Sequence, residues 1–227
     1  MLAVPPSVGE YRVLDAGCGM RLGVELPSNA YVVGIDISEA ALAKNPALDE
    51  RIVGDIQKTT LPSESFDLVV CHDVLEHLDD PVAAVRHLVR ALKPGGEFDV
   101  RMPLIWSTKG IVTRLTPHRF HIWCYRVLMG VETAGQEGYG PFPTRLRIAP
   151  RQLEHEILGA GLEVVFVERW RQSGNLRPFL ERIWTLLGVI ESVLPGRGAT
   201  DYHGRFRRPH VPELSGAEGG TEPAARS

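Results

Sequence analysis

The chain has 227 residues, of which 44% are hydrophobic and 23% charged, and its formal net charge is -3 at pH 7. This length suits one sizeable α/β domain with appended segments and is short for two full domains. The slightly acidic balance gives no electrostatic reason to expect nucleic acid as the main partner. The three isolated cysteines favour a reducing compartment. Because no signal-peptide pattern or membrane-spanning apolar run is visible, we expect a cytoplasmic protein.

Short apolar runs rich in β-branched residues alternate with helical stretches. The runs are 13–16, 31–35, 51–53, 66–71, 97–101 and 163–167. The alternation predicts an α/β, Rossmann-like three-layer sandwich with a mostly parallel sheet of six or seven strands, of which six are legible. One helix is predicted from Pro81, with Lys93-Pro94-Gly95-Gly96 ending it, and another from Pro150 to Gly159.

Residues 103–149 interrupt this alternation with a stretch rich in Pro, Gly, Arg and aromatic residues. A long insertion in a compact domain is more often functional than incidental, so we expect a lid or acceptor-binding segment within a domain spanning 1–170. Residues 171–195 are predicted to form an amphipathic helix that packs on the domain or in a homodimer seam. Membrane contact is disfavoured because its polar side is not basic. Residues 196–227 are expected to be an irregular, partly disordered tail.

A glycine loop after the first apolar run is the most informative motif. Asp15 directly precedes Gly17 and Gly19, and a second acid, Asp36, ends the next apolar run. A dinucleotide fold would need a third glycine, and its pyrophosphate would meet the charge of Asp15. That carboxylate suits an ammonium group, Asp36 suits a ribose diol, and Asp55 can accept from an adenine amine. Three such acids indicate a cationic nucleoside, S-adenosylmethionine (SAM).

The blocks VLDAGCG, VVGIDIS, GDIQKTTLPSESFDLVVC, HDVLEHLDDP and LKPGG follow in this order over about residues 11–102. Together they resemble the class I SAM-dependent methyltransferases, and the small-molecule branch with the ubiquinone/menaquinone methyltransferases is the most similar. The resemblance implies SAM as cofactor and S-adenosylhomocysteine as product. It implies that the glycine loop lines the methionine end of SAM and that the acids after the next two strands face the ribose and the adenine. The cofactor-binding residues implied are Asp15, Ala16, Gly17, Gly19, Asp36, Ile37, Asp55, Ile56, Cys71 and His72.

Two features depart from the family pattern. Arg21 stands where the family commonly has a third glycine, and the segment from there to Asp36 is short, so the first helix is expected to be abbreviated or irregular. Family members usually carry covering helices before the first strand, where this chain has only about ten residues. Either the true start of the chain lies upstream, or the insertion at 103–149 or another subunit supplies the cover.

The acceptor is expected to be a small molecule, and oxygen is the favoured acceptor atom. Methyl transfer from a sulfonium is an in-line displacement, and a hydroxyl acceptor also needs a base. Histidine suits that role, and the candidate bases are His72, His118 and His121. The arginines and aromatic residues of the insertion allow an anionic, aromatic or sugar-like acceptor. No metal is predicted, because the histidine spacing in the insertion matches no ligand pattern. The alternatives are C- or N-methylation and an inactive partner subunit that binds SAM or S-adenosylhomocysteine.

Overall fold

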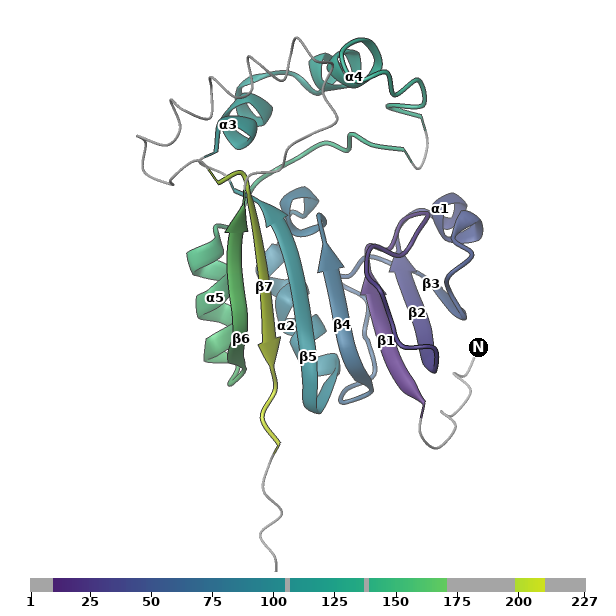
Figure 1. Cartoon of the computed structure of the whole chain (residues 1–227), viewed down its shortest axis with the longest axis vertical. Helices are drawn as coiled ribbons and strands as arrows, with labels where there is room; N and C mark the ends of the chain where they lie inside the picture. Colours follow the sequence, from purple (N-terminus) through teal and green to yellow (C-terminus); the bar gives the residue numbers. More distant parts are fainter. Residues whose placement is uncertain (1–9, 105–106, 137–138, 171–198, 211–227) are drawn as a thin grey trace, which may run out of the picture.

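A seven-stranded sheet forms the centre of the computed structural model, which describes residues 10–104, 107–136, 139–170 and 199–210. The strand order is β3-β2-β1-β4-β5-β7-β6 (Figure 1). The strands are β1 (Tyr11–Ala16), β2 (Ala30–Asp36), β3 (Glu50–Val53), β4 (Phe66–His72), β5 (Leu92–Pro103), β6 (Glu163–Trp170) and β7 (Asp201–Arg207). Strands β1 to β5 pair in parallel, and β7 runs antiparallel between β5 and β6. The predicted α/β fold with a mostly parallel sheet is confirmed.

Two helices cover one face of this sheet. They are α2 (Pro81–Ala91) and α5 (Pro150–Gly159), both of which the sequence predicted. Helix α2 begins where the side chain of Asp80 accepts from the backbone N–H of Ala83, and its apolar side is buried in the main core. Its end passes directly into β5, so the Pro-Gly-Gly segment lies in that strand rather than in a separate turn. The remaining helices are α1 (Glu39–Lys44), η1 (Leu75–His77), α3 (Thr108–Leu115) and α4 (His118–Val127).

The seventh strand lies in the segment that was expected to be an irregular tail, and that expectation was wrong for residues 201–207. Tyr202 and Phe206 on β7 are fully buried in the main core, so this strand belongs to the sheet domain. The sequence signal is weak because the outward side chains of β7 are His203, Arg205 and Arg207, and Gly204 stands among the inward ones. The helix expected at 171–195, and the homodimer seam that depends on it, lie outside the described residues.

Residues 17–29 continue the glycine loop and contain no helix. The first helix, which we expected to be abbreviated or irregular, is therefore absent between β1 and β2. Gly23 and Pro27 interrupt the segment, and its apolar side chains pack on the sheet instead. Leu22 and Leu26 contact one small cluster, and Val24 contacts a second one built from Val13, Leu68 and Val70. This loop therefore covers the β1 side of the sheet face opposite α2 and α5.

We call that opposite side of the sheet the second face. On β5, Phe98 and Val100 point into the main core, whereas Glu97, Asp99 and Arg101 alternate with them and point to the second face. These charged side chains pair with neighbours, as Arg101 does with Asp73 at 2.8 Å. Within the described ranges, no helix covers the β5 and β7 part of this face. The charged pairs keep this part polar.

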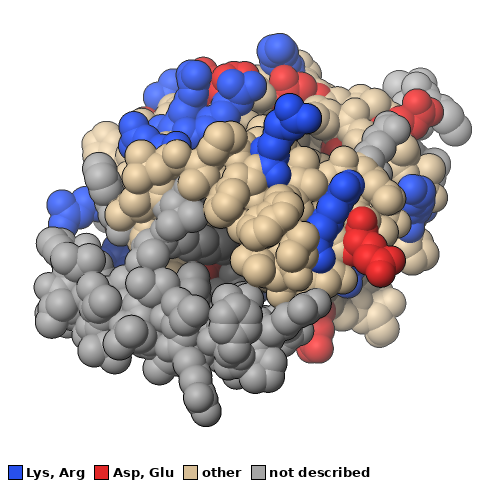
Figure 2. All heavy atoms as spheres, turned by 90° about the horizontal axis from the view of Figure 1, so that it is seen from above, with Lys and Arg blue, Asp and Glu red and all other residues tan. Residues whose placement is uncertain are grey.

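The insertion lies above the carboxyl ends of the strands, where Figure 1 shows α3 and α4. Its return segment is attached to η1 through hydrogen bonds from the backbone N–H groups of Arg145 and Leu146 to the carbonyl of Glu76, at 2.7 and 3.0 Å. Seen from above, Lys and Arg side chains are spread over this end of the molecule (Figure 2). None of the helices in the described ranges is long and apolar enough to cross a membrane. The lid role of the insertion stays a prediction.

Candidate functional site

Gly17 and Gly19 shape the loop between β1 and β2. Both have positive φ, at +76° and +54°, a conformation that glycine adopts without strain. A Cβ on Gly17 would lie 2.4 Å from the Cγ2 atom of Val74, so no larger residue fits there. No heavy atom lies within 4 Å of the equivalent position on Gly19, so the loop has an open side at this point. A ligand can approach the backbone closely there.

Asp36 anchors the same loop from the end of β2. Its Oδ2 accepts from the N–H of Gly19 at 2.9 Å, and its Oδ1 accepts from the N–H of Ser38 at 2.8 Å. The side chain of Ser38, not that of Asp36, caps α1. Each carboxylate oxygen has a second lone pair, so Asp36 can still accept from two ribose hydroxyls. The next residue, Ile37, leaves 77% of its surface exposed, which suits contact with a flat adenine ring.

Asp15 lies beside Asp36 and is only 5% exposed. Burial, with the charge of Asp36 as a further cause, raises the pKa of Asp15 to about 7. A cation bound against Asp15 would lower this pKa again, because it would compensate for the lost hydration and for the negative charge of Asp36. The acids at the glycine loop are therefore chemically suited to the ammonium group and ribose of SAM, and their binding roles stay a prediction. Ala16 is fully buried behind them.

Asp55 follows β3 and adjoins this site, since Gly54 donates to the carbonyl of Asp36 at 3.0 Å. Burial opposes ionisation of Asp55, but hydrogen bonds from Gln57 outweigh it and lower the pKa. Both of those bonds, from the backbone N–H and from Nε2, end on Oδ1 at 2.9 Å. Asp55 thus shapes its own turn, and Ile56 is buried, so only the backbone of Ile56 could reach an adenine edge.

Cys71 and His72 end β4 and face opposite sides of the sheet. Cys71 is fully buried in the main core, where burial raises the pKa of its thiol well above the usual value. The Cys71 side chain therefore points away from the glycine loop, and only the backbone of Cys71 could contact SAM. The His72 ring lies on the second face with Nε2 2.6 Å from Oδ1 of Asp99. Its Nδ1 is buried and has no hydrogen-bond partner among the described residues.

His118 and His121 lie together on α4, with ring centroids 6.3 Å apart. His121 shares a hydrogen bond with the hydroxyl of Thr116 at 2.5 Å, and the Nδ1 of His118 is buried without a hydrogen-bond partner in the described ranges. Burial lowers the pKa of His121, and the charge of His118 adds to that effect. Burial also lowers the pKa of His77, whose Nδ1 lies 2.8 Å from the carbonyl of Pro143. In the described part of the chain, the His72 ring contacts neither the His118 ring nor the His121 ring.

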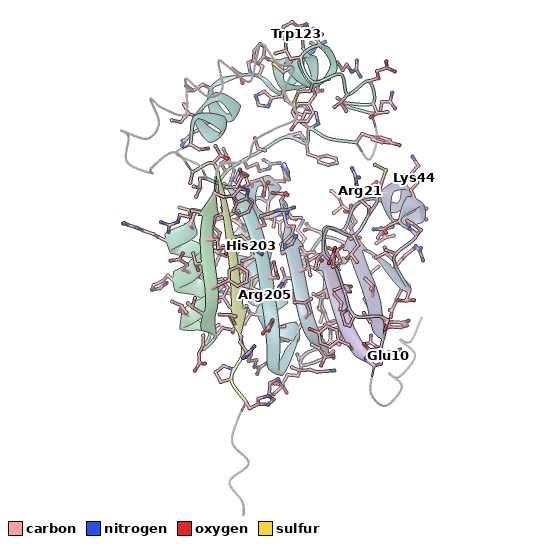
Figure 3. All side chains as sticks on the ribbon, viewed as in Figure 1. Glu10, Arg21, Lys44, Trp123, His203 and Arg205 are labelled. Atoms are coloured by element: carbon pink, nitrogen blue, oxygen red, sulfur yellow. The ribbon has the colours of Figure 1, made fainter. Side chains whose placement is uncertain are left out.

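The arginines of the insertion are all exposed, and two of them are paired with the same carboxylate. Arg145 and Arg147 both approach Oδ1 of Asp79, at 2.9 and 3.6 Å. Arg114 on α3 and Arg119 on α4 are exposed at the surface. Figure 3 shows Arg21 at the upper end of the glycine loop, and this side chain is also exposed. Exposed arginines could meet an anionic acceptor, but the pair at Asp79 already has a partner.

Comparison with known proteins agrees with this geometry. Residues 14–99 match the family described as a methyltransferase domain. A ubiquinone biosynthesis O-methyltransferase of Hahella chejuensis is 38% identical over 96 residues, which cover 38% of this chain and 40% of the relative. A probable S-adenosylmethionine-dependent methyltransferase of Mycolicibacterium smegmatis is 37% identical over 133 residues, covering 55% of this chain and 51% of the relative. The chain spans about half the length, or less, of these curated relatives.

The fold is also found in solved structures. A SAM-dependent methyltransferase from Mesorhizobium loti matches with a TM-score of 0.55 and 20% sequence identity, over 89% of this chain and 93% of that one. At this identity the likeness concerns the fold alone. The strand order with an antiparallel seventh strand and the match over residues 14–99 lead to one assignment. Residues 14–99 match a methyltransferase domain, and the described chain has the fold of SAM-dependent methyltransferases.

Proposed function

We propose that the protein transfers the methyl group of SAM to an oxygen of a small-molecule acceptor. Bound SAM supplies a methyl group on a positively charged sulfur. Asp15 pairs with the ammonium group, Asp36 accepts from the ribose hydroxyls, and the open side of the loop at Gly19 admits the methionine end. These residues would hold SAM at the carboxyl ends of β1 and β2.

The observation that carries the choice of oxygen is the pair of histidines on α4. A hydroxyl acceptor must lose a proton as the new bond forms, and a neutral imidazole can accept that proton. Burial lowers the pKa of His121, which favours its neutral form near pH 7. The buried Nδ1 of His118, without a partner in the described ranges, can take a hydrogen bond from an acceptor hydroxyl. The name of the Hahella chejuensis relative, an O-methyltransferase, agrees with this choice.

The acceptor that we propose is a hydroxylated, aromatic or sugar-like small molecule. An anionic group on it has less support, because Arg145 and Arg147 already pair with Asp79. Three free cysteines, two of them buried, agree with a reducing compartment, so we also propose a cytoplasmic location.

The proposal is tested with labelled SAM, the full-length protein and a panel of phenols, catechols, sugars and primary amines. We expect an O-methylated product, and calorimetry should show SAM binding that is weakened at least about tenfold in Asp36→Asn. In His118→Ala and His121→Ala, SAM binding should persist while turnover falls by about 100-fold in at least one variant. Methylation of amine or carbon only would contradict the choice of oxygen. Normal turnover in both variants would remove these histidines from the mechanism.

A further inference from the structure

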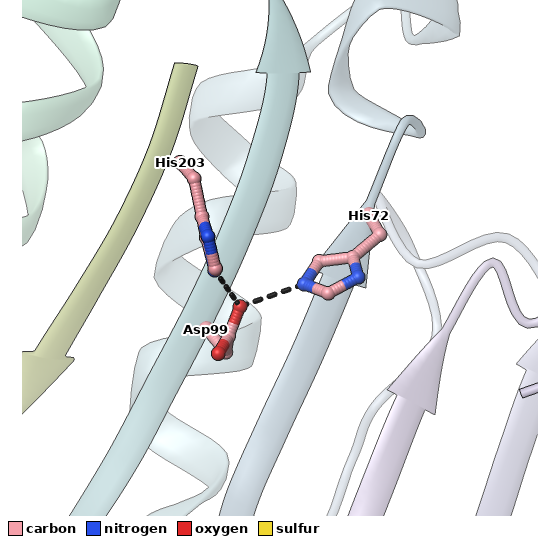
Figure 4. Close-up of side chains that lie close together, drawn as sticks. All are labelled: His72, Asp99 and His203. Carbon is pink, nitrogen blue, oxygen red and sulfur yellow. Dashed lines mark hydrogen bonds and ion pairs between the residues drawn. The ribbon is translucent and has the colours of Figure 1, made fainter. Parts of the chain in front are cut away.

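Three side chains from three neighbouring strands meet on the second face. His72 comes from β4, Asp99 from β5 and His203 from β7 (Figure 4). The Oδ1 atom of Asp99 lies 2.6 Å from Nε2 of His72 and 2.7 Å from Nε2 of His203. All three potential ligand atoms lie within 4.8 Å of one another. Because the three strands are hydrogen-bonded neighbours in one sheet, the backbone fixes this arrangement.

We propose that His72, Asp99 and His203 bind a divalent transition-metal ion. Two imidazole nitrogens and one carboxylate oxygen suit Zn²⁺, Fe²⁺, Co²⁺ or Mn²⁺, whereas Mg²⁺ and Ca²⁺ prefer oxygen ligands throughout. Three protein ligands would leave further coordination positions for water or another small ligand. Asp99 and His203 lie in none of the motifs that mark the SAM site, and His72 is the one residue that the metal site would share with the residues assigned to SAM.

Asp99 is held as a metal ligand should be. It is only 1% exposed, and Arg205 donates to its Oδ2 from Nε at 2.7 Å and also from Nη2. These bonds leave Oδ1 directed at the two imidazoles, and such outer contacts orient the ligands of metal sites.

The position of His203 is fixed by aromatic neighbours. Its ring meets the ring of Phe166 edge-on at a centroid distance of 4.9 Å, and that of Trp170 at 6.0 Å. The His72 and His203 rings are nearly perpendicular, at 85°, with centroids 5.7 Å apart. These contacts limit rotation of the imidazole, so little side-chain freedom remains to be lost when an ion binds.

The same three groups can also form a metal-free cluster in which both imidazoles donate to Oδ1. Ligand atoms about 2.1 Å from an ion are separated by about 3.0 Å at octahedral angles and by about 3.4 Å at the tetrahedral angles that Zn²⁺ prefers. Entry of an ion therefore requires each nitrogen–oxygen distance to lengthen by about 0.3 to 0.8 Å, which side-chain rotations provide. The charge of Arg205 offsets that of Asp99, which favours ions bound strongly by imidazole over Mg²⁺.

The test uses chelator-treated, full-length protein and needs no methyl acceptor, so its result does not depend on the proposed methyl transfer. CoCl₂ and ZnCl₂ are titrated separately by calorimetry, and Co²⁺ also by visible absorption. We expect one ion per chain with a Kd on the order of 10 µM or tighter. His203→Ala should weaken binding at least about tenfold. His155→Ala, which removes an exposed histidine of α5, is the matched control and should bind as the natural chain does.

The absence of a single stoichiometric site, or equal affinity in His203→Ala and the natural chain, would overturn the proposal. A second measurement does not depend on the folding of any variant. Imidazole ¹⁵N NMR of the natural chain with Zn²⁺ should show changes at Nε2 of His72 and His203 among the eight histidines. Changes confined to other histidines would also overturn it.

Discussion

Asp15 offers the sharpest test of how the cofactor site works, through the substitution Asp15→Asn. Burial and Asp36 raise its pKa from 3.8 to about 7. The folded state thus holds this proton more tightly than the unfolded chain does. The stability that this protonation gives is complete below about pH 3.8 and is lost as the pH rises toward 7. At about 1.4 kcal/mol per pH unit, the loss reaches about 4 kcal/mol by pH 8.

Asparagine stays neutral at every pH, so Asp15→Asn should gain stability relative to the natural chain as the pH rises. From the same pKa values, the difference in free energy of unfolding should grow by about 2 kcal/mol between pH 5.5 and pH 8. Urea denaturation of the cofactor-free protein at several pH values measures this directly. Glu25→Gln, an exposed carboxyl in the same loop, is the control and should show no such growth.

The same carboxyl should link SAM binding to pH. Pairing with the ammonium group requires Asp15 to lose its proton, so SAM affinity should rise about tenfold between pH 5.5 and pH 7. This window lies below the pKa of an α-amino group, so the ligand keeps its charge throughout. In Asp15→Asn, binding should be weaker and nearly independent of pH. The assignment of Asp15 as the buried acid of this site would be refuted by one result. In that result, the free energy of unfolding and the SAM affinity would change with pH in the same way in the variant and in the natural chain.

Two further substitutions test the loop and the seventh strand. Gly17→Ala should destabilise the protein by about 2 kcal/mol or more in urea denaturation, because a positive φ and contact with Val74 both oppose a Cβ. Gly19→Ala should cost only about 1 kcal/mol, since space is open there, and equal losses in the two variants would contradict the geometry. Phe206→Ala should cost about 3 to 5 kcal/mol if β7 is part of the core, and a loss below about 1 kcal/mol would place that strand outside it.

The local sequence was sufficient to predict those features that depend on residues close together in the chain. The apolar runs predicted six strands, Pro81 marked the start of α2, and the order of acids and glycines predicted a SAM site between β1 and β2. The sequence was less informative about side-chain direction. Cys71 and His72 are adjacent in the chain, yet one faces the core and the other the second face, because successive residues of a strand alternate.

The seventh strand and the histidine–aspartate cluster depended on tertiary structure. Strand β7 carries Arg, His and Gly, and it becomes a strand because β5 and β6 pair with it on both edges. His72 and Asp99 are 27 residues apart, and Asp99 and His203 are 104 apart, so no local spacing could indicate the cluster. The sequence by itself determined the domain class and indicated SAM as the proposed methyl donor, because both depend on residues close together in the chain. Only the tertiary structure decided which distant side chains meet on the second face, because that depends on strand order and register.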